Sequence, residues 1–439
     1  MDILAHPTNR AGRELLQVYR QVLKAVTADA LVRKAVRLEG DILRIAGLSV
    51  RLSDYRRVAV LGAGKASAAM AVTLEDILGG RIESGVVVTK EGHAEPLHRI
   101  RLLEAAHPVP DQRSLAAGAA IADLASSLGE GDLAIVLISG GASALMELPA
   151  GDLTLADLQQ TNTALLRCGA TIEEINAVRS RLSRIKAGGL ARLLAPARAV
   201  CLVLSDVLGN PLHVIGSGPC WTAAPAGIRP ADVVERYRLQ EVLPASVLRL
   251  LQAAADCPDL PPVEHFIIGD VRTALATARD ALQAMGHAPL ILTASLRGEA
   301  RELGTLVGAM AADLPRLHEE AGIDSLILGG EPTVTVRGDG RGGRCMEMAA
   351  AAALAMEGTK AVAVLSAGTD GTDGPTDAAG ALVDGATAPH ARESGYPLPE
   401  ALHSNDTYPA LDAVGALIRT GPTGSNVNDV VLLLHAPDP

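Results

Sequence analysis

The chain has 439 residues, of which 48% are hydrophobic, 20% charged and only 2% aromatic, and its formal net charge is −11. This acidic balance argues against a nucleic-acid surface, which needs a basic stripe, and the longest apolar runs are far shorter than the ~20 residues of a membrane span. Residues 1–10 lack the apolar segment of a signal peptide. The five cysteines are scattered without a Cys-x-x-Cys pair, so we expect free thiols and a cytoplasmic protein.

Length and composition favour two or three domains with aliphatic cores, as in parallel sheets covered by Ala- and Leu-rich helices. Residues 10–36 have helical spacing and predict a helical hairpin lying on a sheet. A looser stretch with prolines, residues 225–230, is interpreted as a connection, because an α/β alternation restarts after it. The sequence therefore predicts two α/β domains, residues 1–228 and 229–439.

The first strand, residues 57–61, runs directly into Gly62-Ala63-Gly64-Lys65-Ala66-Ser67 and an Ala-rich helix. Glycines let the backbone approach a ligand, and a helix N-terminus offers unpaired N–H groups to an anion. Lys65 at this helix start is unfavourable against the helix dipole, which indicates an anionic ligand. The motif completes neither a Walker A loop nor Gly-x-Gly-x-x-Gly, and the alternative is a glycine turn with a solvent-facing lysine.

Two further strands, residues 85–89 and 101–106, lead to His93 and His107, each of which we interpret as a hydrogen-bonded loop histidine. The next strand, residues 133–138, enters Ser139-Gly140-Gly141-Ala142-Ser143. This turn is not a nucleophile elbow, and we interpret it as an anion nest in which serine hydroxyls assist backbone N–H groups. A plain tight turn is the alternative.

Residues 154–194 predict helix and carry a basic cluster, most of which we interpret as a solvated face. Arg184 and Lys186, which precede a Gly-Gly pair, are candidates to reach a phosphate or carboxylate. The strand at residues 199–204 ends in Ser205-Asp206, and Asp206 is a candidate ligand for a cation or a hydroxyl group, or the cap of the next turn.

In the second half, strands at residues 266–268, 290–293 and 325–328 alternate with helices at residues 274–285 and 299–314. Gly329-Gly330-Glu331-Pro332-Thr333 follows and predicts a short strand to Val336. Arg344 then begins the next helix after a Gly/Arg loop, which repeats the pattern of Lys65. Two helix starts with glycines and a cation predict two phosphate-binding regions, one in each domain.

The apolar strand at residues 361–365 leads into a loop, residues 367–380, that is rich in Asp, Thr and Gly. Carboxylates, hydroxyls and bare N–H groups are suited to a hydrated divalent cation beside phosphate, and a tight Asp/Gly turn is the alternative. Residues 420–429, small and polar, precede the last strand at residues 430–435 and predict a further wall of the site, or a loop that ties down the C-terminus.

Together these stretches resemble the type-2 (class II) glycerate kinase family, whose C-terminal domain is often called MOFRL. The resemblance covers almost the whole chain, and the residues that carry it are 60–66, 138–145, 216–219, 329–333, 342–344, 367–380 and 420–429. It implies an N-terminal DUF4147 domain with a Rossmann-like parallel sheet and a C-terminal mixed-sheet α/β domain that includes the MOFRL region, residues 325–435. It also implies an active site in the cleft between the two domains.

The resemblance further implies ATP- and Mg²⁺-dependent phosphorylation of D-glycerate, usually to 2-phosphoglycerate. It implies catalytic roles for Lys65, Arg344, Asp370 and Asp373. Either of these two aspartates could bind the metal or accept the hydroxyl proton, and Asp206 is a third candidate to bind the metal. The candidate nucleotide- and phosphate-binding residues are Gly62, Gly64, Ser139, Gly140, Gly141, Ala142, Ser143, Glu331, Thr333, Asn426 and Asn428. Arg184 and Lys186 are the candidate substrate-binding residues. Asn210 stands where family members often have Asp, so it is not a metal candidate.

Two other functions are considered. A nicotinamide-dependent hydroxypyruvate reductase would need a complete dinucleotide fingerprint, which Ser67 interrupts, and an acidic ribose ligand, for which Glu83 is a poor candidate. A non-catalytic nucleotide-binding protein would have little need for two cation-bearing loops and a triple-Asp loop. The expected partners are the small molecules D-glycerate and ATP, without nucleic acid or membrane, and the chain is expected to be a monomer or homodimer.

Overall fold

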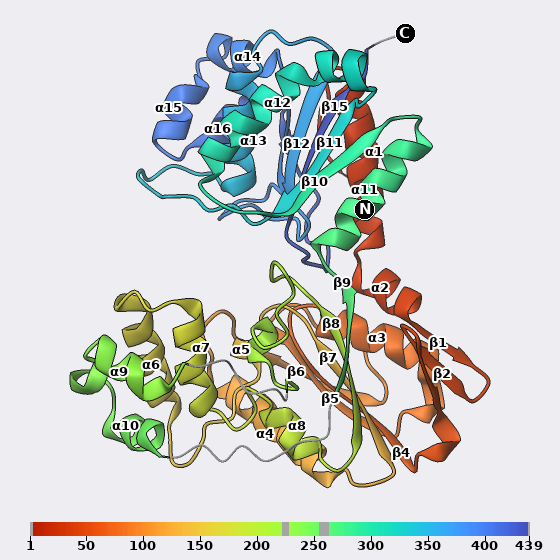
Figure 1. Cartoon of the computed structure of the whole chain (residues 1–439), viewed down its shortest axis with the longest axis vertical. Coiled ribbons are helices and arrows are strands. Elements are labelled where there is room, and N and C mark those ends of the chain that lie inside the picture. Colours follow the sequence, from red (N-terminus) through yellow and green to blue (C-terminus); the bar gives the residue numbers. More distant parts are fainter. Residues whose placement is uncertain (1–2, 222–227, 254–262, 438–439) are drawn as a thin grey trace. The chain divides into compact units, whose positions relative to one another are not determined.

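The computed structural model describes residues 3–221, 228–253 and 263–437. It divides into two compact units: unit 1 joins Met1–Ala30 to Gly269–Pro439, and unit 2 is Leu31–Ile268 (Figure 1). The expected division at residue 228 differs from this one, because the first helix belongs with the C-terminal half and unit 2 continues to residue 268. Residues 225–227 of the expected connection, like Cys257, lie outside the described residues. None of the described helices combines the length and apolar character that a membrane crossing requires.

Unit 2 contains a six-stranded sheet in the order β6-β5-β4-β7-β8-β9. Its strands are β4 (Arg57–Ala63), β5 (Ser84–Lys90), β6 (Ile100–Ala105), β7 (Asp132–Ile138), β8 (Arg198–Leu204) and β9 (Glu264–Gly269). From β6 to β8 every neighbouring pair is parallel. All residues of β7 are buried, as expected for an apolar strand of a parallel sheet that is covered on both faces. The Rossmann-like expectation for this unit is confirmed.

The strand order contains a switch point between β4 and β7. From β4 the chain builds β5 and β6 on one side and then returns to build β7 and β8 on the other. Ligands of such sheets bind outside the carboxyl ends of the strands at this point. The two predicted glycine-rich turns follow these two strands. Helices α3 (Ser67–Leu78) and α4 (Gln112–Ser127) come next, and Asp111 caps α4 in a capping box with Ser114.

The expected helical stretch at residues 154–194 is divided into three helices. These are α6 (Leu155–Arg167), α7 (Ile172–Arg181) and α8 (Gly189–Leu194), interrupted by Gly169 and Gly188, which both have positive φ. Helices α6 and α7 share an apolar cluster with α9 (Pro230–Arg236) and α10 (Ala245–Gln252). A short helix, α5 (Ala142–Leu145), follows β7. The three-stranded antiparallel sheet of β1 (Val36–Glu39), β2 (Ile42–Ile45) and β3 (Leu48–Arg51) was not expected.

Unit 1 contains a mixed six-stranded sheet in the order β10-β11-β15-β12-β13-β14, which confirms the expected sheet type. Its strands are β10 (Pro289–Leu296), β11 (Ser325–Gly330), β12 (Val362–Gly368), β13 (Gly380–Asp384), β14 (Leu417–Ile418) and β15 (Asp429–His435). Strand β15 runs antiparallel between β11 and β12. Its first residue, Asp429, is therefore paired with the last residues of both neighbours, Gly330 and Gly368.

Two pairs of helices pack in unit 1. Helices α12 (Ala300–Ala321) and α13 (Arg344–Ala355) share an apolar cluster with alternate residues of the sheet strands. Their backbones approach closely, since a Cβ atom at Gly304 would lie 2.4 Å from the carbonyl oxygen of Met348. Helices α1 (Arg10–Ala25) and α11 (Val271–Ala284) pack together, α1 against β12 and α11 against β10 (Figure 1). The remaining helices of the unit, α14 (Thr387–Glu393), α15 (Leu398–His403) and α16 (Thr407–Ala413), were not expected.

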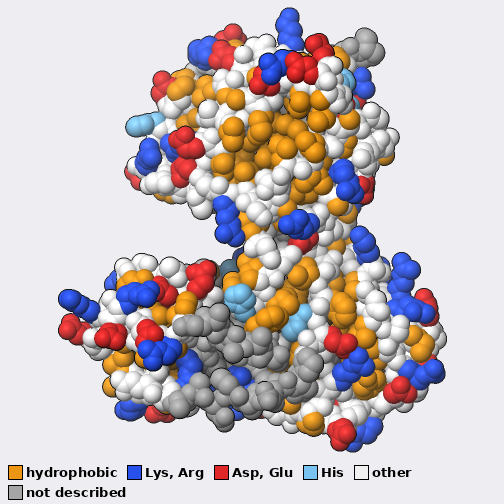
Figure 2. Space-filling model, viewed as in Figure 1, with side chains coloured by type: hydrophobic (Ala, Val, Ile, Leu, Met, Phe, Trp, Pro, Cys, Tyr) orange, Lys and Arg blue, Asp and Glu red, His pale blue; other side chains and the backbone are white. Residues whose placement is uncertain are grey.

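Two expectations for unit 1 need correction. Helix α12 continues beyond the expected end at residue 314 and contains Pro315. The short strand expected up to Val336 does not form, because Thr333 makes only an isolated bridge with Glu299. Three large apolar side chains of β10 and α12, Leu290, Leu292 and Leu306, stay exposed, and hydrophobic side chains gather on the face of unit 1 that Figure 2 shows.

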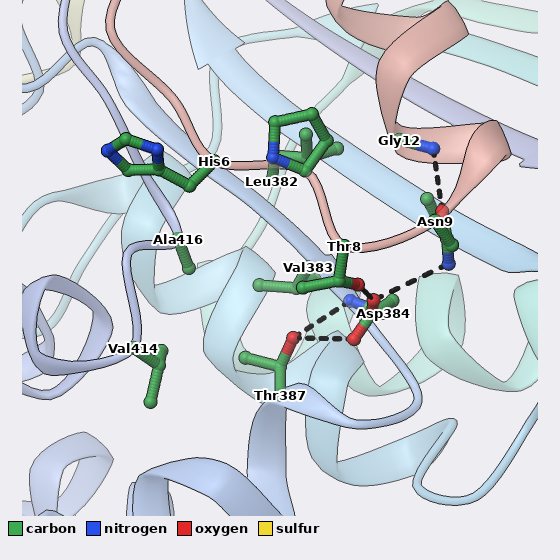
Figure 3. Close-up of a pocket in the computed structure, with 12 residues that line it drawn as sticks. His6, Thr8, Asn9, Gly12, Leu382, Val383, Asp384, Thr387, Val414 and Ala416 are labelled. Atoms are coloured by element: carbon green, nitrogen blue, oxygen red, sulfur yellow. Dashed lines mark hydrogen bonds between the residues drawn. The ribbon is translucent and has the colours of Figure 1, made fainter.

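The N-terminal segment is bound to unit 1 by side chains around a small cavity of about 20 Å³ (Figure 3). The Asn9 side chain caps α1, since its Oδ1 accepts a hydrogen bond from the Gly12 N–H at 2.8 Å. The Asn9 amide also donates to the Val362 carbonyl at 3.1 Å, and the Thr8 hydroxyl donates to Asp384. Unit 1 is therefore assembled from both ends of the chain.

Candidate functional site

The two glycine-rich turns of unit 2 are held together at the switch point. The Lys65 N–H donates to the Gly140 carbonyl at 2.9 Å, and the Ala66 N–H donates to the Ser139 hydroxyl at 3.1 Å. Gly64 has a φ of +138°, and a Cβ atom there would lie 2.1 Å from Ser139 Oγ. Only glycine allows both this conformation and this approach. The structure thus brings together the predicted residues of both turns.

Charged and ionisable side chains from three strand ends surround the second turn. A Cβ atom at Gly140 would lie 1.9 Å from a carboxylate oxygen of Asp206, and one at Gly141 would lie 3.0 Å from the His107 ring and 3.3 Å from Lys65 Cγ. Lys65 follows β4, His107 follows β6 and Asp206 follows β8. Lys65, His107 and Asp206 are therefore neighbours across this turn.

Burial and charge shift the pKa values of these groups. Burial raises the pKa of the Asp206 carboxyl, and the positive charge of Lys65 opposes that shift. Burial, together with the charges of Lys65 and Lys90, lowers the pKa of His107 to about 4, so the imidazole is neutral near pH 7. His107 was expected to be a hydrogen-bonded loop histidine and not a site residue. The position of His107 after a strand was a sign that it could lie at a ligand site. That His107 lies near Lys65 is visible only in the three-dimensional structure.

The serines of the turn after β7 have different surroundings. Ser139 is buried and its hydroxyl is used by the Ala66 N–H, so it stabilises the pairing of the two turns. The Ser143 hydroxyl shares a hydrogen bond of 2.8 Å with the hydroxyl of Ser217. Ser217 belongs to the Gly216–Pro219 loop that contributed to the family resemblance. The turn after β4 and the loop at residues 216–219 therefore both contact the turn after β7.

The two candidate substrate-binding residues have opposite environments. Lys186 is only 5% exposed and forms an ion pair with the buried Glu147. Arg184, two residues earlier, is exposed. A buried, paired ammonium group is held by its partner and is not available at a surface. The environment of Arg184 suits a role in binding an external anion, and the environment of Lys186 suits a structural role.

In unit 1, a network of ion pairs forms where β11 ends and β15 begins. Arg344 Nε and Nη2 donate to the two carboxylate oxygens of Asp429 at 2.5 and 2.9 Å. Arg344 Nη1 lies 3.3 Å from Glu331 Oε1, and the Asn428 amide donates to Glu331 Oε2 at 3.3 Å. Site roles were predicted from the sequence for Arg344, Glu331 and Asn428 but not for Asp429, although the stretch that contains Asp429 was part of the resemblance.

Asp373 caps the helix that begins with Arg344. Its Oδ1 and Oδ2 accept hydrogen bonds from the N–H groups of Cys345 and Met346, at 3.1 and 2.8 Å. The N-cap residue of α13, Gly343, has no side chain to do this. Burial raises the pKa of Asp373 to about 7, although both N–H groups favour the charged form. The catalytic and metal roles of Asp373 stay predictions, and its contacts suit the positioning of Arg344.

The other predicted residues of unit 1 lie in the loops around this network. Asp370 is partly exposed, and its carboxylate accepts the Thr372 N–H at 3.1 Å. Asn426 Oδ1 accepts the Asn428 N–H at 3.0 Å. The Thr333 hydroxyl donates to the Gly298 carbonyl at 3.2 Å. The loop that holds Asp370 is anchored at its base by the buried Tyr19 of α1, whose hydroxyl donates to the Gly368 carbonyl at 2.6 Å.

The donors suit a magnesium ion that is shared with phosphate. Among the residues that the structure describes, no group of three or more His, Cys, Asp or Glu side chains could hold a metal by itself. Mg²⁺ usually keeps several waters and takes one or two carboxylates, with substrate phosphates completing its shell. Within unit 2, Asp206 beside Lys65 fits this requirement, and within unit 1, taken by itself, the partly exposed Asp370 fits it. The carboxylate oxygens of Asp373 are both engaged by backbone N–H groups.

These features define a two-unit α/β protein. Glycine-rich turns lie at the strand ends of the sheet in unit 2, and paired charges lie at the strand ends of the sheet in unit 1. A family model described as a domain of unknown function, DUF4147, matches residues 14–252, and the MOFRL family model matches residues 324–429. The D-glycerate 2-kinase of Thermotoga maritima is 43% identical over 382 residues, which cover 86% of this chain and 90% of that protein. A protein of Agrobacterium vitis, named "Putative hydroxypyruvate reductase", is 44% identical over 86% of this chain and 99% of its own length.

A crystal structure of glycerate kinase from Thermotoga maritima superposes with a TM-score of 0.88 at 38% identity, over 97% of this chain and 99% of that one. The chain therefore belongs to the type-2 glycerate kinase family of enzymes, as its motifs indicated.

Proposed function

We propose that this enzyme transfers the γ-phosphoryl group of ATP to D-glycerate in the presence of Mg²⁺ and releases 2-phosphoglycerate. The structural observation that carries the proposal is the position of Lys65, which ends the glycine-rich turn after β4 and lies against Gly140 and Gly141 of the turn after β7, at the switch point of the sheet. The names of the relatives supply the substrate class.

Phosphoryl transfer needs positioning and charge neutralisation more than covalent chemistry. Lys65, beside the backbone of Gly140 and Gly141, is assigned to the oxygens of the transferred phosphoryl group. Arg344, oriented by Asp429, is assigned to the phosphates in unit 1. Bound Mg²⁺ would neutralise further phosphate charge, and Asp206, beside Lys65, is the carboxylate that would hold it.

The remaining roles concern the glycerate molecule. Asp370 is assigned as the acceptor of the hydroxyl proton, because its carboxylate is partly exposed whereas that of Asp373 caps a helix. Arg184 is assigned to the substrate carboxylate because it is exposed. Lys186 is not assigned to the substrate, since Glu147 already pairs it.

The second candidate function is the reduction of hydroxypyruvate, which the name of one relative suggests. The dinucleotide fingerprint needs its third glycine for close packing of helix and strand. Here Ser67 occupies that position, and its hydroxyl lies 2.7 Å from the carbonyl oxygens of both Gly64 and Val88. The packing around Ser67 therefore favours the kinase.

The test measures ADP formation by the purified chain with ATP, Mg²⁺ and D-glycerate, with the phosphate position of the product read by ³¹P NMR. A parallel assay follows NADH oxidation with hydroxypyruvate. We expect turnover in the first assay only, with the phosphate on carbon 2. A phosphate on carbon 3 would correct the product, and NADH oxidation without ADP formation would replace the proposal with the reductase.

A further inference from the structure

Two carboxylates bind Arg344, and their environments differ. Asp429 is 2% exposed and makes two parallel hydrogen bonds to the guanidinium group. The Glu331 side chain is 46% exposed and makes one longer contact, 3.3 Å, to Arg344 Nη1. A bidentate buried pair is strong and geometrically specific, whereas a single contact at an exposed side chain contributes little. Arg344 therefore has one fixed partner and one exchangeable partner.

Glu331 also bonds a second donor. Its Oε2 accepts from the Asn428 amide at 3.3 Å, while its Oε1 faces Arg344. Two donors from different elements, α13 and the loop before β15, thus hold the two oxygens of one carboxylate. A phosphoryl group also presents two oxygens to such a pair of donors, and it carries more negative charge than a carboxylate.

We propose that Glu331 is an internal stand-in for phosphate: its carboxylate occupies the donors Arg344 Nη1 and Asn428 Nδ2 until a nucleotide phosphate displaces it, while Asp429 stays bound and orients the guanidinium. The inference deepens the proposed function and rests on it for the identity of the ligand. It reverses the role of Glu331 from a direct phosphate ligand, which its negative charge opposes, to a competitor of phosphate. Asp429 is a positioning residue in this arrangement.

The two carboxylates can be compared by the same chemical change. We would measure the dissociation constant for ADP, with Mg²⁺ present, by calorimetry on the full chain and on Glu331→Gln and Asp429→Asn. Glu331→Gln should bind ADP about two- to fivefold more tightly, the range of a partly exposed ion pair. The KM for ATP should fall by a similar factor. Asp429→Asn should bind ADP at least about tenfold more weakly, because a disoriented guanidinium loses its paired geometry.

Unchanged or weaker ADP binding by Glu331→Gln would overturn the stand-in role, as would an absence of ADP binding by the unmodified chain. If Asp429→Asn fails to fold, as judged by circular dichroism, the result for Glu331→Gln still decides. The gain should shrink at high salt, because the Glu331 side chain is exposed and its charge is screened. ADP binding does not require glycerate. Tighter ADP binding by Glu331→Gln without glycerate turnover would therefore support the stand-in role and count against the proposed substrate.

Discussion

The two candidate regions use different physical means to approach an anion. In unit 2 the region consists mainly of backbone, with the turns around Gly64 and Gly140 in close contact beside Lys65. In unit 1 it consists of opposed side chains, with Arg344 and Asp429 directly paired at a strand end. The structure of the first region therefore depends on the close approach of two backbone turns, and its stability should be sensitive to single added atoms. The second depends on charge balance and should be sensitive to pH and to single charges.

The largest effect is expected at the lysine of the backbone-built region. Lys65→Ala should lower kcat for glycerate phosphorylation by about 10²–10⁴-fold, because a charge that stabilises the transferred phosphoryl group is lost from a preorganised site. Thermal unfolding should change little. The control is Lys34→Ala, an exposed lysine of the same unit, which should retain full activity. Near-normal turnover in Lys65→Ala would show that the region around Lys65 in unit 2 is not catalytic.

The next effect separates Lys186 from the substrate-binding residues. Lys186→Ala leaves Glu147 as an unpaired buried charge, so the free energy of unfolding should fall by about 3–5 kcal/mol. Urea denaturation measures this loss. The matched control is Arg184→Ala, which should change stability by less than about 0.5 kcal/mol and raise the KM for glycerate. The reverse pattern, a stable Lys186→Ala with a raised KM, would restore Lys186 to the substrate site.

A single methyl group tests how strongly unit 2 depends on closeness. Gly64→Ala would place a Cβ atom 2.1 Å from Ser139 Oγ, at a φ of +138°. We expect a loss of about 2–4 kcal/mol in the free energy of unfolding, from strain and overpacking together. Gly92→Ala is the control, because it also has positive φ but has open space around its Cβ position. Equal losses of stability in both variants would mean that backbone strain, and not the close approach of the two turns, makes glycine necessary at position 64.

The charge balance of unit 1 should appear as a pH dependence. Asp373 keeps its proton up to about pH 7 in the folded chain and up to only about pH 4 when unfolded. Between these values the folded chain binds more protons, so the contribution of Asp373 to the free energy of unfolding falls as pH rises from about 4 to about 7. Asp373→Asn cannot ionise and should reduce this slope by up to about 1 kcal/mol per pH unit. Urea denaturation at several pH values measures this slope. An equal slope in Asp373→Asn and in the unmodified chain would contradict the assignment.

Local features of the fold were predictable because they depend on neighbours in sequence. Apolar runs located the strands β4, β7 and β15 to within one or two residues. The β1–β3 sheet was not predicted, although glycines in its two turns, Gly40 and Gly47, were a usable signal. The unit boundary was not predictable, because helical periodicity shows that α1 buries a face without showing which sheet covers it.

The same limit applies to the candidate site. Several predicted residues that follow strands lie close together within each unit, since neighbouring strand ends bring their loops together, and their functional roles stay predictions. Partners that come from distant segments were not predictable, and these include the Glu147 partner of Lys186 and the lysine near His107. Asp429 belonged to the polar stretch 420–429 that predicted a wall of the site, but it was not singled out as a site residue. Its pairing with Arg344 follows only from the register of β15.

Unit 1 is built from two separate segments of the chain, and this sets the order in which the two units can fold during synthesis. Helix α1 is made before unit 2, but its covering strands follow only after all of unit 2, Leu31–Ile268, has been made. At ordinary elongation rates this delay is about 10–50 s. Throughout it Leu15, Tyr19 and Val22, which are fully buried in the finished protein, have no sheet to pack against. Unit 2, a continuous segment, can fold in the meantime, whereas a fragment that starts at residue 269 would lack the helix whose Tyr19 anchors the loop of Asp370.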